Sequence, residues 1–182
     1  MAVEIEKKYR LGDGDVGRVE DALALAAADL IGEEFEENTI YRGGILDEAG
    51  AILRIRVIDG KGILTYKRRI KNDSAIKHQV EHETAFANVE EMREIVANLG
   101  FKPRLIYEKI RKTWRLGAAA IMLDELPFGM FMEIEGSIAE IGEVETALGI
   151  EDLAVENETY PRLTARLGTK VGDVIETRFP AK

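Results

Sequence analysis

Residues 4–9 read EIEKKY and place two glutamates and a lysine, Glu4, Glu6 and Lys8, at every second position. On a helix these charges would be ordinary members of a solvated face. On a strand they would all point to one side of a sheet, because successive side chains alternate between its faces. Val3, Ile5 and Tyr9 would then lie on the other side, and the charged side would need a use for its charge.

The composition limits the class of protein. With 182 residues, of which 46% are hydrophobic, the chain is expected to form a single domain over residues 1–182 with a core of its own. It has no cysteine and only two histidines, which excludes disulfides and thiolate sites and argues against a multi-histidine zinc site. No signal peptide or membrane-spanning stretch is recognisable, so we expect a soluble cytoplasmic protein that does not bind membranes.

The net charge of -9 argues against a broad nucleic-acid-binding surface, although it leaves room for a local basic site. We therefore expect no nucleic-acid polymer as a partner.

Hydrophobic periodicity predicts an α+β protein. Helical spacing and end signals indicate helices from Asp15 to Gly32, in 89–100, from Ile138 to Leu148 and after Pro161. Alternation and turn residues indicate about eight strands, in 3–11, 33–44, 51–60, 62–70, 77–86, 102–116, 119–129 and 130–136. Asp59-Gly60-Lys61-Gly62, between two of these strands, is a strong hairpin signal. An antiparallel sheet of this size tends to curl or close, which favours a barrel.

The opening pattern recurs along the predicted strands as pairs of like charge at positions i and i+2. A sheet face in water also alternates apolar and polar residues, and any one pair fits that simpler interpretation. Like charges on one strand gain nothing from each other, however, and the two signs lie on different strands. The basic pairs are Arg54/Arg56, Lys67/Arg69 and Lys109/Arg111; the acidic pairs are Glu4/Glu6, Glu81/Glu83 and Glu133/Glu135, with Asp124 alone.

This segregation suits a site that holds a polyanion together with metal ions. Arginine and lysine make charge-assisted hydrogen bonds to phosphate oxygens. Carboxylates repel phosphate unless a hard divalent cation lies between them, and Mg²⁺ or Mn²⁺ takes such oxygen ligands. The charged face therefore predicts a phosphate-binding site with a divalent metal.

The ordered set of motifs resembles the CYTH superfamily, the triphosphate tunnel metalloenzymes, which include class IV adenylyl cyclases, thiamine triphosphatases and inorganic triphosphatases. The motifs are ExExK, LRIR, a K-x-R strand, E-x-E, a second K-x-R, and an aspartate followed by E-x-E, over residues 3–135. The resemblance implies a closed eight-stranded antiparallel β-barrel, a tunnel with flanking helices whose interior is charged.

The resemblance also implies roles for single residues. Mg²⁺ or Mn²⁺ would bind Glu4, Glu6, Asp124, Glu133 and Glu135, and Glu81 and Glu83 would line the tunnel wall. Lys8, Lys67 and Glu83 would be catalytic. The triphosphate would contact Lys8, Arg54, Arg56, Lys67, Arg69, Lys109 and Arg111.

One position departs from the family pattern. Ile40 stands where the thiamine triphosphatases have a tyrosine that pairs with a strand lysine, a lysine that Lys67 would keep here. The specialised thiamine triphosphatase mechanism is therefore not expected, and Tyr41 is interpreted as a packing or rim residue. His82, between Glu81 and Glu83, is predicted to point outside the barrel.

The sequence favours metal-dependent hydrolysis of a short triphosphate, namely tripolyphosphate, thiamine triphosphate or a nucleoside triphosphate. An adenylyl cyclase that releases pyrophosphate is the main alternative, because both activities must hold three phosphates and metal. A non-catalytic polyphosphate or nucleotide binder would gain from fewer carboxylates. We expect a small-molecule triphosphate as the partner and a monomer or homodimer.

Overall fold

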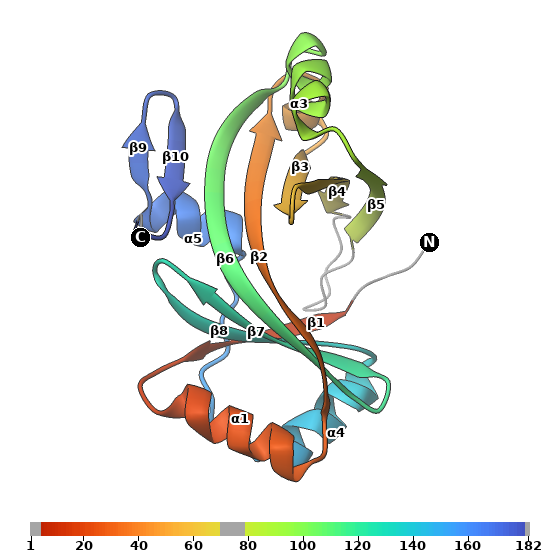
Figure 1. Ribbon diagram of the computed structural model, residues 1–182, viewed down its shortest axis with the longest axis vertical. Helices are drawn as coiled ribbons and strands as arrows, with labels where there is room; N and C mark the ends of the chain where they lie inside the picture. The colour runs from red at the N-terminus through yellow and green to blue at the C-terminus, as the bar shows by residue number, and fades with distance from the viewer. Residues whose placement is uncertain (1–4, 70–78, 181–182) are drawn as a thin grey trace. The chain divides into compact units, whose positions relative to one another are not determined.

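The computed structural model describes residues 5–69 and 79–180 (Figure 1). Within these ranges the helices are α1 Asp15–Leu25, α2 Ile45–Glu48, α3 Val89–Asn98, α4 Ile138–Leu148 and α5 Tyr160–Leu167. The strands are β1 Glu6–Leu11, β2 Asp29–Arg42, β3 Ala51–Ile58, β4 Lys61–Arg69, β5 Gln79–Phe86, β6 Lys102–Leu116, β7 Ala119–Leu126, β8 Gly129–Glu135, β9 Thr169–Val171 and β10 Val174–Thr177. None of the helices in the described ranges is long and apolar enough to cross a bilayer.

Hydrogen bonding orders the main strands as β1-β8-β7-β6-β2-β3-β4-β5. The pairs β1–β8, β7–β8, β6–β7, β2–β3, β3–β4 and β4–β5 are antiparallel. β10 adds a short parallel pairing to β6 and is itself paired with β9. The predicted α+β class with an antiparallel sheet of about eight strands is confirmed, while closure of the sheet into a barrel stays a prediction.

The described chain divides into two compact units, and the division falls within β2 and β6. Unit 1 contains residues 35–69, 79–109 and 158–180, and unit 2 contains residues 5–34 and 110–157. The single domain that the sequence suggests stays a prediction.

Unit 2 packs two helices on one face of the strands β1, β8 and β7. Tyr9, Met132 and Ile134 come from alternate strand positions and are almost completely buried against Val19 and Leu23 of α1. Figure 1 shows α1 and α4 next to each other beside these strands. α4 begins with a reciprocal cap in which the Ser137 and Glu140 side chains bind each other's backbone N–H groups, which satisfies two donors that the helix leaves unpaired.

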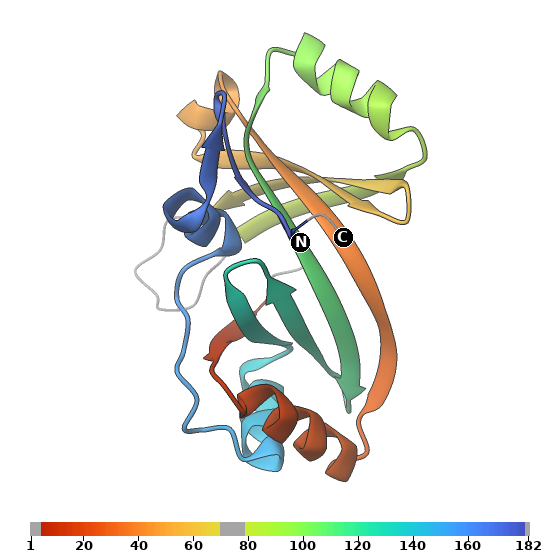
Figure 2. The same ribbon diagram turned by 60° about the vertical axis from the view of Figure 1, so that its left-hand side comes forward.

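Unit 1 packs α3 against the hairpins made by β3, β4 and β5 (Figure 2). Its small apolar cluster contains Tyr41, Ile55 and Val96. Asp59 and Gly60, at the tip of the β3–β4 hairpin, have φ angles of 49° and 74°. Positive φ at both central residues suits the right-handed twist of the flanking strands, so the predicted hairpin is confirmed, with a turn of two residues because Lys61 and Gly62 already pair in β4.

The first predicted helix is too long. α1 ends at Leu25, not at Gly32, and β2 begins at Asp29. Ala27 has a left-handed φ of 53°, and the Ala28 N–H donates to Leu23 O at 3.0 Å, which closes the helix end. The following residues join the sheet, because tertiary strand pairing outweighs the helical tendency of the alanines. The sequence analysis also missed α2 and the β9–β10 hairpin.

Candidate functional site

In unit 2 the strand register brings the predicted charges together on the face opposite α1 and α4. Partners across an antiparallel pair point to the same side, so each registered pair shares a face. The registered charged pairs are Glu6 with Glu135, Lys8 with Glu133, and Arg111 with Asp124.

The charges of unit 2 are paired with each other. Lys8 Nζ lies 3.1 Å from Glu133 Oε1. Arg111 donates from Nε to Asp124 Oδ1 and from Nη2 to Asp124 Oδ2, both at 2.6 Å, and Nη2 also donates to Glu133. Arg111 thus joins two of the predicted metal ligands through one guanidinium group.

These side chains are not a solvated face. Asp124 is 0% exposed and Lys8 and Glu133 are each 6% exposed. Removing a charge from water is costly unless it is paired, so a protein rarely keeps such a cluster without a use for it. The simpler interpretation of a water-facing charged sheet is therefore wrong for this cluster. Glu6 is exposed and Glu135 is half-buried. The predicted role of both residues as metal ligands stays a prediction.

The carboxylates of unit 2 have the right chemistry for a hard divalent cation, since they offer only oxygen donors. Among the described residues, however, no three acidic or histidine side chains converge on one point. Asp124 and Glu133 are held by Arg111 instead. A metal would fit this donor set once Arg111 has moved to another anion.

Unit 1 carries a second charged face. The register aligns Arg54, Thr65 and Glu83 across three neighbouring strands. Arg54 Nη2 donates to Thr65 Oγ1 at 3.2 Å, and Thr65 Oγ1 donates to Glu83 Oε2 at 2.9 Å. Arg54 is 9% exposed and Thr65 is completely buried. The Thr65 hydroxyl therefore bridges Arg54 and Glu83 by hydrogen bonds and orients the two side chains relative to each other.

Lys67 and Glu81 form the next row on the same face. They are registered partners, and Lys67 Nζ lies 2.6 Å from Glu81 Oε2. The basic and acidic strands that the sequence separates thus become direct neighbours, and each cation faces a carboxylate. Glu81 and Glu83 lie beside the phosphate-binding candidates of this face, and their predicted place on a tunnel wall stays a prediction.

Glu36 and Asn38 belong to this face, and the sequence analysis missed both. Glu36 is 0% exposed and lies 3.3 Å from Arg56 Nε and 3.4 Å from Lys109 Nζ. Asn38 is opposite Arg56 in the register. The alternation of positions 36, 38 and 40 was the available signal, but adjacent glutamates at positions 33, 34 and 37 obscured it.

Ile40 and Tyr41 lie on opposite faces of β2. Ile40 is registered with Arg54 and is buried, so an apolar side chain stands beside this cation. Tyr41 packs with Ile55 in the apolar cluster, and burial raises the pKa of its phenol. The packing role predicted for Tyr41 is confirmed. His82 is exposed and stacks on Tyr66, and its predicted place outside a barrel stays a prediction.

Glu4 and the side chain of Arg69 lie outside the part of the chain that the structure describes. Their predicted roles, a metal ligand and a phosphate ligand, stay predictions.

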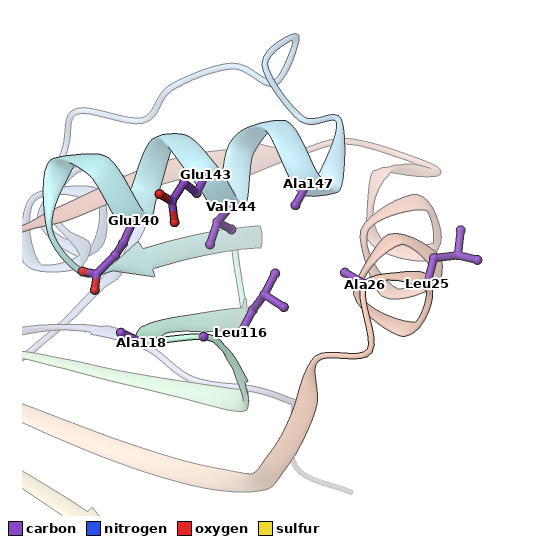
Figure 3. A pocket seen from close by; sticks show the side chains of 9 residues that line it. Leu25, Ala26, Leu116, Ala118, Glu140, Glu143, Val144 and Ala147 are labelled. Atoms are coloured by element: carbon purple, nitrogen blue, oxygen red, sulfur yellow. The ribbon is translucent and has the colours of Figure 1, made fainter.

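A pocket of about 500 Å³ lies in unit 2 on the helix side of the strands. Figure 3 shows Leu116 and Val144 at its centre, with Leu25 at one edge and Glu140 and Glu143 along α4. None of the described residues that line it is basic. The pocket therefore does not suit a polyphosphate, and the charged faces remain the candidate site.

Comparison with known proteins agrees with these motifs. A model of the CYTH domain matches residues 2–162, which is most of the chain. The chain belongs to the CYTH domain family. The family assignment made from the charged motifs is thereby confirmed.

Relatives of this CYTH chain include a Methanocaldococcus jannaschii protein named "Putative adenylate cyclase MJ0240". It is 32% identical over 149 residues, which is 80% of this chain and 83% of the relative. The PH1012 protein of Pyrococcus horikoshii has a similar structure, with a TM-score of 0.73 and 26% identity over 88% of this chain and 98% of the other. The Hippeastrum adenylyl cyclase homologue HpAC1, described as having a dominant triphosphatase activity, has a TM-score of 0.67 at 20% identity, over 90% of this chain and 95% of its own. The HpAC1 likeness concerns the fold alone.

Proposed function

We propose that this CYTH protein hydrolyses a short triphosphate with the help of a divalent metal ion. The observation that carries the proposal is the burial of cations and carboxylates within each unit: Lys8, Asp124 and Glu133 of unit 2, and Lys109 and Glu36 of unit 1, are each 6% exposed or less. Strongly desolvated groups of both signs are typical of sites that bind and transform charged substrates.

The cations of unit 1 are proposed to bind phosphate oxygens. Among its described residues these are Arg54, Arg56, Lys67 and Lys109, which outnumber the carboxylates Glu36, Glu81 and Glu83 on the same face. This excess of positive charge favours direct binding of a polyanion, with no metal ion needed between the polyanion and the protein. Arginine adds bidentate geometry that matches a phosphoryl group.

The charge balance of unit 2 is the reverse. Lys8 and Arg111 stand beside four acidic residues, Glu6, Asp124, Glu133 and Glu135. Asp124, Glu133 and Glu135, with Glu6 as a further oxygen donor, are proposed to hold Mg²⁺ or Mn²⁺. The bound metal would polarise the phosphoryl group and neutralise negative charge that develops on the leaving phosphate.

In unit 2, Arg111 pairs with both Asp124 and Glu133, and Lys8 pairs with Glu133. Phosphate oxygens would compete with Asp124 and Glu133 for these cations, because all are oxygen anions that accept the same N–H donors. Each carboxylate released by its cation becomes available as a metal ligand. The protein's own ion pairs would thus keep both charge types ordered until substrate arrives.

Proton transfer is proposed to involve Lys67, Glu83 and Lys8, since the thiamine triphosphatase pairing of tyrosine with lysine is missing at Ile40. Glu83 is the most accessible of the three, with a side chain that is 44% exposed, and it is oriented by Thr65. A carboxylate in this setting is suited to orient and deprotonate an attacking water.

Adenylyl cyclase is the second candidate, and the name of the Methanocaldococcus jannaschii relative favours it. The residues of each unit serve both reactions, because the triphosphate must be held in either case. A non-catalytic polyphosphate binder is less consistent with Asp124 and Glu133, whose negative charges would weaken polyanion binding.

Product analysis distinguishes these functions. Purified protein is incubated with Mg²⁺ or Mn²⁺ and with tripolyphosphate, thiamine triphosphate or ATP, and free phosphate, cyclic AMP and pyrophosphate are measured. Phosphate release supports the proposal, cyclic AMP with pyrophosphate supports the cyclase, and turnover of none of them contradicts both.

Variants test the assigned residues. Glu133→Ala and Arg56→Ala are expected to lose most activity, whereas Glu125→Gln, on an exposed neighbouring position of β7, should retain it. A fully active Glu133→Ala protein would show that the metal assignment is wrong.

A further inference from the structure

Glu36 is a carboxylate in the middle of β2 that none of the proposed metal or proton-transfer roles uses. It is completely buried, with 0% exposure, and Asn38, two positions on, is also 0% exposed. A buried carboxylate at this depth is destabilising unless cations and hydrogen bonds compensate it. Its surroundings therefore indicate what it does.

Asn38, Arg56 and Lys109 are among the groups that lie around Glu36. Asn38 Nδ2 donates a hydrogen bond to Glu36 Oε2 at 3.0 Å. Arg56 Nε lies 3.3 Å from the same Oε2 and donates to Asn38 Oδ1 at 3.4 Å. Lys109 Nζ lies 3.4 Å from Glu36 Oε1 and also stands 5.5 Å from the centre of the Tyr160 ring. Glu36 is thus shared between two cations that are proposed to bind phosphate.

The contact to Arg56 is made on one side of the guanidinium group. A guanidinium presents its donors as a planar fork, and the edge that carries Nη1 and Nη2 can bind two oxygens of one phosphoryl group. Both contacts are made by Nε, so the Nη1–Nη2 edge takes no part in the contact with Glu36 and Asn38. An arginine held at Nε loses little further freedom when it binds a ligand.

We propose that Glu36 is a positioning residue for phosphate binding. Together with Asn38 it fixes Arg56 through Nε and directs the Nη1–Nη2 edge toward a phosphoryl group, and it holds the ammonium of Lys109 on the same face. The inference deepens the proposed function and rests on it, because the ligand is the phosphate chain of the triphosphate. Glu36 is not assigned any contact with the ligand.

The simplest opposing view is that Glu36 only repels a polyanion. In that case neutralising it would strengthen phosphate binding. The positioning role predicts the opposite sign, so the direction of the change decides between them.

The binding test uses metal-free calorimetry with inorganic tripolyphosphate as the probe. Glu36→Ala should raise the dissociation constant by about tenfold or more, the scale on which residues that orient a binding group act. Glu36→Gln should recover part of the loss, because its amide oxygen still places a polar acceptor atom beside Arg56 Nε. Glu37→Gln is the matched control, since Glu37 is the next residue of β2 and pairs on the other face with Arg93 and Arg178.

Circular dichroism and thermal melting check that each variant folds. If Glu36→Ala does not fold, the binding of Glu36→Gln is compared with wild type instead. Unchanged or tighter binding by a folded Glu36→Ala or Glu36→Gln protein overturns the proposal.

A second readout needs no ligand. The Nε–H proton of Arg56, assigned by its disappearance in Arg56→Lys, should exchange slowly with water in wild type and rapidly in Glu36→Ala, as measured by nitrogen-15 NMR. Equal exchange in the two proteins shows that positioning by Glu36 is wrong, whatever the protein binds. Slow exchange in wild type without any tripolyphosphate binding shows instead that the proposed function fails.

Discussion

Replacing Asp124 by asparagine should destabilise the ligand-free protein strongly. Asp124 is completely buried and accepts two hydrogen bonds of 2.6 Å from Arg111. Removing one partner of a buried ion pair leaves the other charge uncompensated and costs about 3–5 kcal/mol. Because Glu133 still accepts from Arg111, we expect the lower end, about 3 kcal/mol in the free energy of unfolding. For a chain of this size that corresponds to a fall in Tm of about 6–12 °C.

The assay is equilibrium urea unfolding in the presence of a metal chelator, so that neither metal nor triphosphate contributes to the stability. Glu125→Gln serves as the control, since Glu125 is the next residue of β7 and is exposed. Its free energy of unfolding should stay within about 0.5 kcal/mol of wild type. The slope against urea should be the same in all three proteins, which verifies that the same surface is exposed on unfolding.

If Asp124→Asn lowers the free energy of unfolding by less than about 1 kcal/mol, or raises it, the reasoning is refuted. Losses below about 1 kcal/mol are typical of solvent-exposed ion pairs. The bidentate contact with Arg111 would then not contribute as a buried ion pair. High salt offers a further check, since screening by salt weakens an exposed pair much more than a buried one.

Three further predictions concern other parts of the chain. Burial acts to raise the pKa of Glu145, but hydrogen bonds from Lys7 and Tyr9 outweigh it and hold that pKa below its ordinary value. The stabilisation is therefore complete above the unfolded pKa of about 4.3 and is lost as the pH falls through the lower folded pKa, so the stability difference between wild type and Glu145→Gln should shrink in acid; a constant difference in pH-dependent urea unfolding would contradict this. Because Lys8 and Arg111 both pair with Glu133, and phosphate that competes for these cations would release this carboxylate to a metal, Mg²⁺ and tripolyphosphate together should raise Tm by more than the sum of their separate effects, and additive shifts in thermal melts would argue against this competition. Gly60→Ala, at a φ of 74°, should destabilise by about 1 kcal/mol, whereas Gly142→Ala inside α4 should stabilise by up to about 1 kcal/mol, and urea unfolding of the pair checks both signs.

The sequence analysis identified the charged faces because side-chain alternation is a local property of an extended backbone. Whether Lys8 shares a face with Glu6, or Arg54 with Arg56, depends only on their spacing along one strand. The family assignment has the same origin, since the motifs that carry it are pairs at i and i+2. The hairpin at Asp59-Gly60 was also predictable, because turn geometry with positive φ depends on two neighbouring residues.

The end of α1 was not predictable in this way. The alanine-rich run up to Gly32 favours a helix by intrinsic propensity, whereas β2 begins at Asp29 because its backbone finds a partner in β6. That partner is distant in the sequence, so a local window contains no sign of it. Glu36 was missed for a related reason: only the registered neighbours Asn38 and Arg56 distinguish it from the adjacent glutamates.

By itself, the sequence determined which charged residues share a face of one strand, the eight main strands and the family, whereas it gave no sign of the short β9–β10 hairpin. Only the tertiary structure decided which cation meets which carboxylate: Arg111 with Asp124 and Glu133, Lys67 with Glu81, and Arg56 and Lys109 with Glu36. The reason is that pairing across strands depends on register, and register is set by turns, bulges and core packing along the whole sheet. Burial follows from the same long-range packing, and it is burial that distinguishes the charged residues of the candidate site from a solvated sheet face.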